Sequence, residues 1–122
     1  METEIPVRDI MTRPVITVGA DLDILSAAKK MGSANVGSLI ITAEGKTTGI
    51  LTERDLVKKV LAEGKDPRAI KVIEIMSSPV VSIEPDASLR EAAALMLRSG
   101  VKRLPVISNG RLVGIITDTD LA

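Results

Sequence analysis

The feature that most constrains the fold of this 122-residue chain is an internal repeat. Placing Ile10 on Ile75 fixes an offset of 65 residues, and the two halves then align without a gap. The stretch GILTERDL at 49–56 falls on GIITDTDL at 114–121. Self-similarity at a fixed offset indicates two copies of one structural unit.

Identical residues occur along the whole alignment and not only in that motif. They include Met11/Met76, Pro14/Pro79, Val15/Val80, Asp21/Asp86, Ala27/Ala92, Met31/Met96, Leu39/Leu104, Gly49/Gly114, Thr52/Thr117 and Asp55/Asp120. Half of the chain, about sixty residues, buries too little surface to be comfortably stable alone. We therefore expect the two halves to pack sheet to sheet, related by a pseudo-twofold axis.

Each half has the pattern of a β-α-β-β-α unit, which gives an α/β fold class. The stretches PVITV at 14–18 and PVVSI at 79–83 predict short strands, each opened by a proline. The sequence further predicts helices at 24–34 and 89–99 and strand pairs at 36–42 with 47–51 and at 103–108 with 112–116. A turn that contains glycine joins each strand pair. A last helix is expected to follow residue 52 and to end at Gly64.

Signals at the helix ends support these boundaries. Ser88 and Glu91 form a capping-box pattern at the start of the second long helix, and Asp23 can cap the first. Gly100 follows the second helix, where a left-handed residue is favoured, and Asn35 occupies the matching position in the first. Because the ends agree after the same shift, they support the alignment independently.

The repeat predicts two domains, residues 7–64 and 72–122, joined by the linker KDPRAIK. The proline of the linker prevents the preceding helix from continuing. The chain ends at Ala122, where the second copy of the last helix is expected to begin. In the second domain we therefore expect that helix to be missing or disordered.

Composition argues against several classes of function. The chain has no cysteine and no histidine, which removes disulfides, the usual zinc ligands and the common pairs of nucleophile and base. Sixteen Lys and Arg residues balance sixteen Asp and Glu residues, and aromatic residues are absent, so neither charge nor stacking favours nucleic acid. No apolar run reaches the ~18 residues of a membrane span, and we expect a cytoplasmic protein without a membrane partner.

The repeated motifs resemble those of a tandem pair of CBS domains, named after cystathionine β-synthase. The shared features are an Asp-Ile-Met or Glu-Ile-Met opening, a Pro-Val pair, a helix, two apolar strands and Gly-Ile-[Leu/Ile]-Thr-x-x-Asp-Leu. The resemblance covers about Val7 to Leu121. It implies a regulatory module that binds AMP, ADP, ATP or a related adenosyl ligand in clefts between the two domains, with no catalytic cofactor.

Carried over to this sequence, the resemblance assigns a phosphate contact to Thr52 and Thr117 and the ribose hydroxyls to Asp55 and Asp120. Backbone N–H groups at a helix start are unpaired and attract anions, and a carboxylate can accept two hydroxyl donors. Thr-x-x-Asp is also a capping box, in which both side chains only satisfy the first amides of a helix. The two interpretations can hold together.

Adenine would lie against methyl and thioether groups, because the chain offers no aromatic partner. The candidates for this contact are Met11, Pro14, Val15, Met76, Pro79 and Val80. Methionine is also a common filler of hydrophobic cores, and that alternative stays open.

A basic pair distinguishes the second half from the first. Lys102 and Arg103 precede a Pro-Val pair and stand where the first half has Gly37 and Ser38. By resemblance to AMP-sensing kinase subunits, basic residues of one domain help to bind the phosphate of a nucleotide whose ribose the other domain holds. This predicts that the Asp55 cleft, served by the basic pair, binds nucleotide more tightly than the cleft served by the neutral pair. The alternative is a surface role for either basic side chain.

We do not expect an enzyme. Asp55 and Asp120 belong to separate copies of the motif and have no reason to approach within the ~5–10 Å of an acid/base pair. The alternative to ligand sensing is a ligand-free module for protein–protein interaction or dimerisation. Dimers of such pairs are common in the family, so a homodimer is expected, and a regulated partner protein is compatible with both functions.

Overall fold

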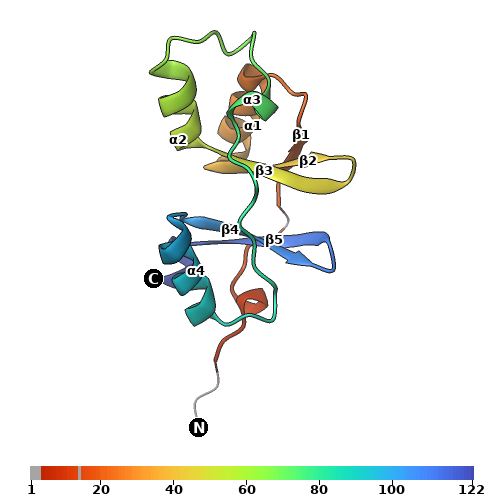
Figure 1. Ribbon diagram of the computed structural model, residues 1–122, viewed down its shortest axis with the longest axis vertical. Helices are drawn as coiled ribbons and strands as arrows, with labels where there is room; N and C mark the ends of the chain where they lie inside the picture. The colour runs from red at the N-terminus through yellow and green to blue at the C-terminus, as the bar shows by residue number, and fades with distance from the viewer. Residues whose placement is uncertain (1–3, 14) are drawn as a thin grey trace. The chain divides into compact units, whose positions relative to one another are not determined.

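The two repeats exchange their opening segments in the folded chain. The computed structural model describes residues 4–13 and 15–122, and the chain divides into two units (Figure 1). Unit 2 comprises Ile16–Val80, and unit 1 combines Val81–Ala122 with the N-terminal segment that ends at Val15. A unit in space is therefore not one continuous repeat.

Unit 2 is a small sheet with its helices on one side (Figure 1). Its elements are β1 (Thr17–Gly19), α1 (Ile24–Ala34), β2 (Ser38–Ala43), β3 (Lys46–Thr52), α2 (Glu53–Asp55), the π-helical segment η2 (Leu56–Leu61) and α3 (Val72–Ile75). The strand order is β1-β2-β3, with β1 parallel to β2 and β2 antiparallel to β3. The sheet therefore carries Thr52, the last residue of β3, on an edge strand.

Unit 1 repeats this plan with a two-stranded sheet. Its elements are the 3-10 turn η1 (Val7–Asp9), α4 (Leu89–Ser99), β4 (Arg103–Ser108), β5 (Arg111–Thr117) and the 3-10 turn η3 (Thr119–Leu121). Strands β4 and β5 are antiparallel. Both hairpins have a register irregularity at matching positions, between Ile41 and Thr42 and between Val106 and Ile107.

Both long helices lie where the sequence predicts them, because their end signals are local. The side chains of Asp23 and Ser88 each accept the amide three residues later, at 2.9 and 3.1 Å. Asn35 and Gly100 end the helices in left-handed backbone, at φ 55° and 68°. The predicted strand pairs are confirmed within two residues at each end.

The last helix of the repeat is less regular than predicted. After the single α-helical turn of α2, the backbone widens in η2, where the Ala62 amide donates to the Val57 carbonyl at 2.8 Å. The helical segment ends at Leu61, three residues before the predicted end, and Gly64 closes the following turn in left-handed backbone at φ 67°. The matching stretch of unit 1 is the short turn η3.

The two predicted opening strands differ from each other. PVITV contributes to the strand β1, but PVVSI forms only a single parallel bridge, between Ile83 and Val106. In unit 2, Ala20 extends the ladder by donating its amide to β2 at 3.2 Å. The matching residue of the second repeat is Pro85, which has no N–H to donate. The prediction of a strand at 79–83 is therefore wrong.

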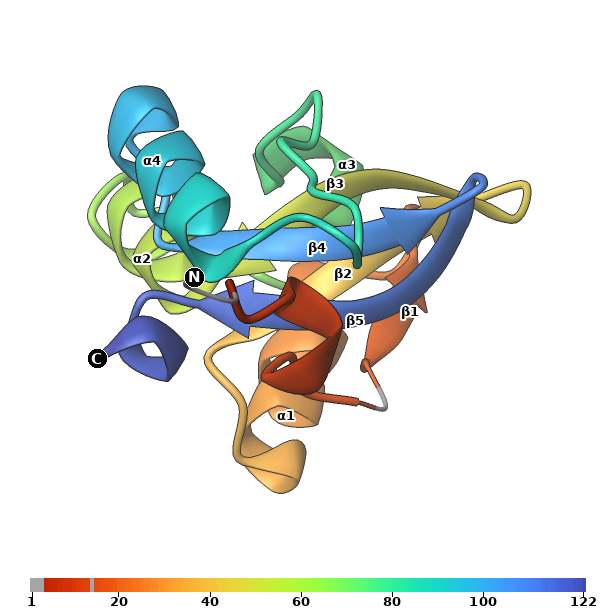
Figure 2. The ribbon, with the colours of Figure 1, turned by 90° about the horizontal axis from the view of Figure 1, so that it is seen from below.

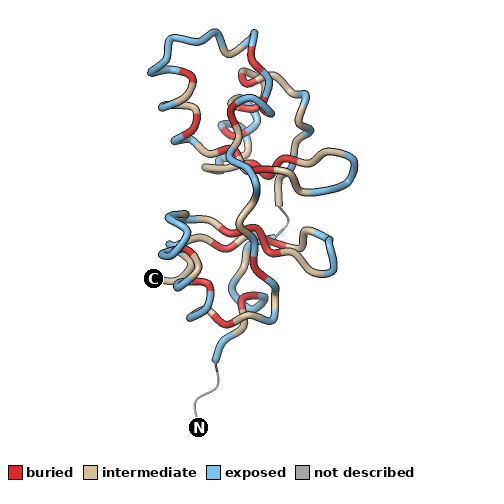
Figure 3. The backbone as a smooth tube through the Cα atoms, in the orientation of Figure 1, coloured by how far each residue is buried: buried red, intermediate tan, exposed pale blue. Residues whose placement is uncertain are grey.

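Each unit has its own core of aliphatic and methionine side chains, and the exposed positions include the hairpin tips (Figure 3). The buried core of unit 2 consists of Ile24, Ala27, Met31, Leu39, Ile41, Leu51, Val60, Ile70, Val72 and Ile75. The buried core of unit 1 consists of Val7, Ile83, Ala92, Met96, Leu104, Val106 and Ile116. Val7 and Val72 come from the exchanged segments, so each core is completed by the opening of the other repeat.

Backbone hydrogen bonds hold the exchanged segment of unit 2. The Val72 amide donates to the Leu22 carbonyl at 2.8 Å, at the start of α3. Five residues further on, Ser77 and Ile50 exchange two bonds of 2.9 and 3.1 Å. The segment thus reaches from the helix layer to strand β3, where it pairs with Ile50, two residues before the end of that strand.

The N-terminal segment makes the same contacts in unit 1. The Val7 amide donates to the Ala87 carbonyl at 2.7 Å, and Thr12 and Ile115 exchange two bonds of 2.8 and 3.1 Å. The segment (red in Figure 2) accordingly lies alongside β5. Every partner in this set is related to its unit 2 counterpart by the 65-residue offset of the sequence.

A methionine of each exchanged segment packs against a glycine of the receiving strand. A Cβ atom added to Gly49 would lie 2.4 Å from the sulfur of Met76, and one added to Gly114 would lie 2.5 Å from the sulfur of Met11. Carbon and sulfur in contact need well over 3 Å, so neither position accepts a side chain without movement of the methionine. The packing of these methionines therefore explains why each GIxT stretch begins with glycine.

We predict that Gly49→Ala destabilises the chain by about 1–3 kcal/mol, because the new methyl group overlaps the thioether of Met76. Gly32→Ala is the matched control, since nothing lies within 4 Å of its added Cβ and alanine is the better helix former inside α1. Urea unfolding followed by circular dichroism measures both. A second change, Met76→Ala, should recover part of the loss. Equal stabilities of the two glycine variants would contradict the packing argument.

The cap of α1 gives a prediction of pH dependence. The Ser26 hydroxyl and amide donate to the Asp23 carboxylate at 2.7 and 2.9 Å and hold the pKa of Asp23 below its ordinary value of 3.8. A depressed folded-state pKa stabilises the fold above the unfolded-state pKa, and this contribution is lost as pH falls through the folded-state value. In Asp23→Asn the amide oxygen caps the helix without titrating.

We therefore expect the thermal midpoint of Asp23→Asn to fall less steeply than that of the unmodified chain between about pH 5 and about pH 2. Thermal unfolding followed by circular dichroism at several pH values measures the difference. Parallel profiles for the two chains would show that the carboxylate does not contribute in this range.

Candidate functional site

The Thr-x-x-Asp motif of the first repeat lies where β3 ends and α2 begins. Thr52 is the last residue of the strand and the N-cap of the helix, and its hydroxyl accepts the Asp55 amide at 3.2 Å. In return, Oδ2 of Asp55 accepts the Thr52 amide at 2.9 Å. The two residues form a reciprocal capping box, so the capping interpretation is confirmed for this copy.

The second copy of the motif makes the same pair of bonds at the end of β5. Oδ2 of Asp120 accepts the Thr117 amide at 2.8 Å, and the Thr117 hydroxyl accepts the Asp120 amide at 3.4 Å. The turn that follows, η3, has three residues. A three-residue turn carries little of a helix dipole, so the case for anion binding at Thr117 depends on side chains.

The two carboxylates differ in their surroundings. The Asp55 side chain is 10% exposed, and its Oδ1 forms an ion pair of 3.0 Å with the ammonium of Lys59. The same ammonium donates to the Ile75 carbonyl at 3.0 Å, at the end of α3. Asp120 is half-buried. Its bonds within the described residues are those to Thr117, so one of its oxygens remains able to accept donors from a ligand.

Strand register brings a second residue of each unit next to its threonine. Ser38, at the start of β2, is paired with Thr52, and Arg103, at the start of β4, is paired with Thr117. Directly paired residues present their side chains on the same face of a sheet. The half-buried Arg103 therefore lies beside the second motif, while Lys102, one residue earlier, is exposed.

The candidates for the adenine contact occupy the exchanged segments. Met11 and Met76 are half-buried against their glycines, which supports the packing alternative for both without excluding a ligand contact. Val15 and Val80 are half-buried, and Pro79 is exposed. Pro14 lies outside the described residues.

The predicted site residues thus divide between the two units. Unit 2 contains Ser38, Thr52, Asp55, Met76, Pro79 and Val80, and unit 1 contains Met11, Val15, Lys102, Arg103, Thr117 and Asp120. That Lys102 and Arg103 bind the phosphate of a nucleotide held by Asp55 stays a prediction.

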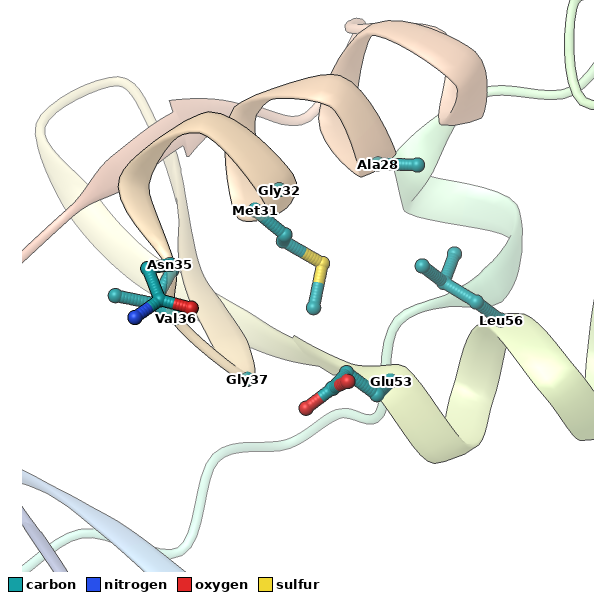
Figure 4. A pocket seen from close by; sticks show the side chains of 8 residues that line it. All are labelled: Ala28, Met31, Gly32, Asn35, Val36, Gly37, Glu53 and Leu56. Atoms are coloured by element: carbon teal, nitrogen blue, oxygen red, sulfur yellow. The ribbon is translucent and has the colours of Figure 1, made fainter.

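A pocket that sequence reasoning missed lies beside each motif. In unit 2 it has a volume of about 340 Å³ and is lined by Ala28, Met31, Gly32, Asn35, Val36, Gly37, Glu53 and Leu56 (Figure 4). Met31 and Leu56 point into it from opposite sides (Figure 4). Unit 1 has a second pocket, of about 410 Å³. Each residue that lines it is 65 positions after a residue that lines the first pocket.

The second pocket is lined by Ala93, Met96, Leu97, Gly100, Val101, Lys102, Asp118 and Leu121. Most of these residue types are typical of helix packing, and only the offset itself could have revealed that the two sets correspond. The polar groups change from Asn35 and Glu53 in one pocket to Lys102 and Asp118 in the other. The pockets are equivalent in position but differ in chemistry.

Residues 4–13 and 15–122 contain neither a metal-binding cluster nor a membrane-spanning helix. Within these ranges, no group of three or more acidic side chains is arranged to hold a metal ion. The helices of the same ranges include none with the length and apolar character needed to cross a membrane.

Comparison with known proteins identifies the family. The family model of the CBS domain matches the chain twice, over residues 7–62 and 72–122. The chain therefore belongs to the CBS-domain family and carries two copies of the domain.

Three similar proteins illustrate the range of the family. The chain is 40% identical to the uncharacterized protein MK0525 of Methanopyrus kandleri, over 96% of this chain and 61% of that protein. A hexameric CBS-CP12 protein from bloom-forming cyanobacteria has a TM-score of 0.92 at 33% identity, over 98% of this chain and 67% of that one. The CBS domain pair of protein MJ0100, in complex with 5′-methylthioadenosine and S-adenosyl-L-methionine, has a TM-score of 0.87 at 34% identity, over 98% and 94%.

Proposed function

We propose that the chain is a cytoplasmic regulatory module that binds an adenosine-containing ligand at its Thr-x-x-Asp motifs and catalyses no reaction. The main support is the motif geometry: in both repeats a carboxylate is held by the amide of a threonine at a strand end. The similarity to the MJ0100 pair, which was crystallised with two adenosyl compounds, supports the ligand class.

The motif suits a ribose for a physical reason. The amide of Thr52 or Thr117 fixes one carboxylate oxygen, so little side-chain freedom is lost when a ligand hydroxyl binds. A carboxylate has lone pairs for further donors, and hydrogen bonds to charged groups are the stronger ones. The half-buried Asp120 is the more accessible of the two carboxylates.

The residue beside each threonine bears on the choice of ligand. Arg103, paired with Thr117, offers a guanidinium that matches a phosphate, whereas Ser38, paired with Thr52, offers a neutral hydroxyl. In contrast to the sequence-based prediction that the basic pair serves the Asp55 cleft, this pairing favours a phosphorylated nucleotide at the second motif. An uncharged or cationic adenosyl compound would lose no binding energy at the first motif, because Ser38 carries no charge.

A homodimer is the proposed state of the module, and occupancy by the ligand would change its contact with a regulated protein. The hexameric cyanobacterial relative supports self-association within the family. Equal numbers of acidic and basic residues leave no net charge to oppose association.

A ligand-free interaction module is the second candidate. It is favoured by large apolar side chains on the helices, since Val57, Leu61 and Leu97 are 55%, 70% and 87% exposed. Val57 and Leu61 lie four residues apart on η2, and neighbouring exposed apolar side chains mark contact sites for other proteins.

We predict that Asp55→Asn and Asp120→Asn each weaken adenosine or AMP binding at their own motif by roughly ten- to a hundredfold, the effect of losing a charged hydrogen-bond acceptor. Asparagine keeps an oxygen that can accept the threonine amide, so the cap is preserved. Isothermal titration calorimetry with adenosine, AMP and S-adenosylmethionine measures the affinities. Because the chain has no Trp or Tyr, a 260 nm band after denaturation and filtration would also reveal nucleotide retained in purification.

Glu53→Gln and Asp118→Asn are the matched controls, because both residues are exposed and lie in the same turns. These side chains line the two pockets. If only the control variants lost binding, the result would show that the ligand binds in the pockets and not at the motifs. Absence of binding by the unmodified chain to all three compounds would favour the interaction module.

A further inference from the structure

Lys59 connects two parts of unit 2 that are distant in the sequence. Its ammonium lies 3.0 Å from Oδ1 of Asp55 and 3.0 Å from the carbonyl oxygen of Ile75. The first contact reaches the Thr-x-x-Asp motif, and the second reaches the exchanged segment that opens the other repeat. A single side chain therefore links the motif to that segment.

The contact with Asp55 completes the fixation of the carboxylate. Oδ2 accepts the amide and hydroxyl of Thr52, at 2.9 and 3.2 Å, while Lys59 takes Oδ1. With both oxygens bound, the carboxylate plane cannot rotate freely about its last bond. The lone pairs that remain are held in fixed directions, which is the condition for accepting two neighbouring hydroxyl groups.

The contact with Ile75 fixes the other side of the motif. Carbonyl groups in the last turn of a helix lack partners within the helix, and a cation there is favourable. The next residue is Met76, whose thioether packs on Gly49 and which is a candidate for the adenine contact. The ammonium thus joins the carboxylate proposed for the ribose contact to the segment that carries Met76.

We infer that Lys59 is a positioning residue for ligand binding at Asp55, which acts by holding the carboxylate and the Met76 segment in one arrangement. This inference rests on the proposed function. The Lys59 side chain is 44% exposed, so water can reach the Asp55 carboxylate when the ammonium is removed, and we expect the variants to stay folded. Lys58 precedes it in η2 and is exposed, which makes it the matched control.

The test uses two ligands that differ only in the ribose hydroxyls, adenosine and 2′,3′-dideoxyadenosine. The full chain carries Asp120→Asn, so that the Asp55 motif dominates binding. Calorimetry gives the ratio of the two affinities for the unmodified Lys59 and for Lys59→Met, Lys59→Arg and Lys58→Met. Circular dichroism establishes that each variant is folded.

We expect Lys59→Met to lower the preference for adenosine over the dideoxy compound by about three- to tenfold, as coupled neighbours typically do. Lys59→Arg, which can still bridge two oxygens, should restore the preference, and Lys58→Met should leave it unchanged. A general loosening of unit 2 would weaken both ligands equally, and that result would overturn the inference. So would an unchanged preference in Lys59→Met.

Failure of the proposed function has a different signature. In that case the chain with Lys59 intact would not bind adenosine or would not prefer it to the dideoxy compound. The inference would then fall with the proposed function. If the preference is present and survives in Lys59→Met, only the role of Lys59 is refuted.

Discussion

The contact on which the rest of this structure depends is the packing of a methionine of one repeat against a glycine of the other. Met76 occupies the space that a side chain at Gly49 would need, and the bonds between Ser77 and Ile50 hold the same segment on β3. The end of β3 bears Thr52, so the packing also fixes the strand that carries the motif. The same arrangement recurs in unit 1.

The parts of the fold that could be predicted from the sequence are those fixed by short-range interactions. Asp23 and Ser88 start the long helices, and Asn35 and Gly100 end them, because each side chain or backbone preference acts within a few residues. The hairpins follow from alternating apolar residues and a glycine turn. The loss of the second opening strand was also predictable, since Pro85 cannot continue a ladder.

The exchange of segments could not be predicted in this way. The short helical turns η1 and α3 were not predicted, and the apolar character of Val7 and Val72 does not say which sheet these residues cover. The same limit applies to the site. The spacing of Lys59 from Asp55 permits an ion pair on one helix face, yet the contact with Ile75 depends on the exchanged segment.

The repeated GIxTxxD motif is mostly accounted for by structure, which changes how its recurrence should be weighed. The glycine is required by a methionine, and the threonine and aspartate cap a helical turn, so these identities would persist in a chain that binds nothing. What the cap does not require is a partly exposed carboxylate at Asp120 with an arginine on the neighbouring strand. Groups that stability leaves unexplained are the stronger indication of a ligand. The partly exposed Asp120 carboxylate and the neighbouring Arg103 therefore add support for ligand binding that the motif geometry does not give by itself.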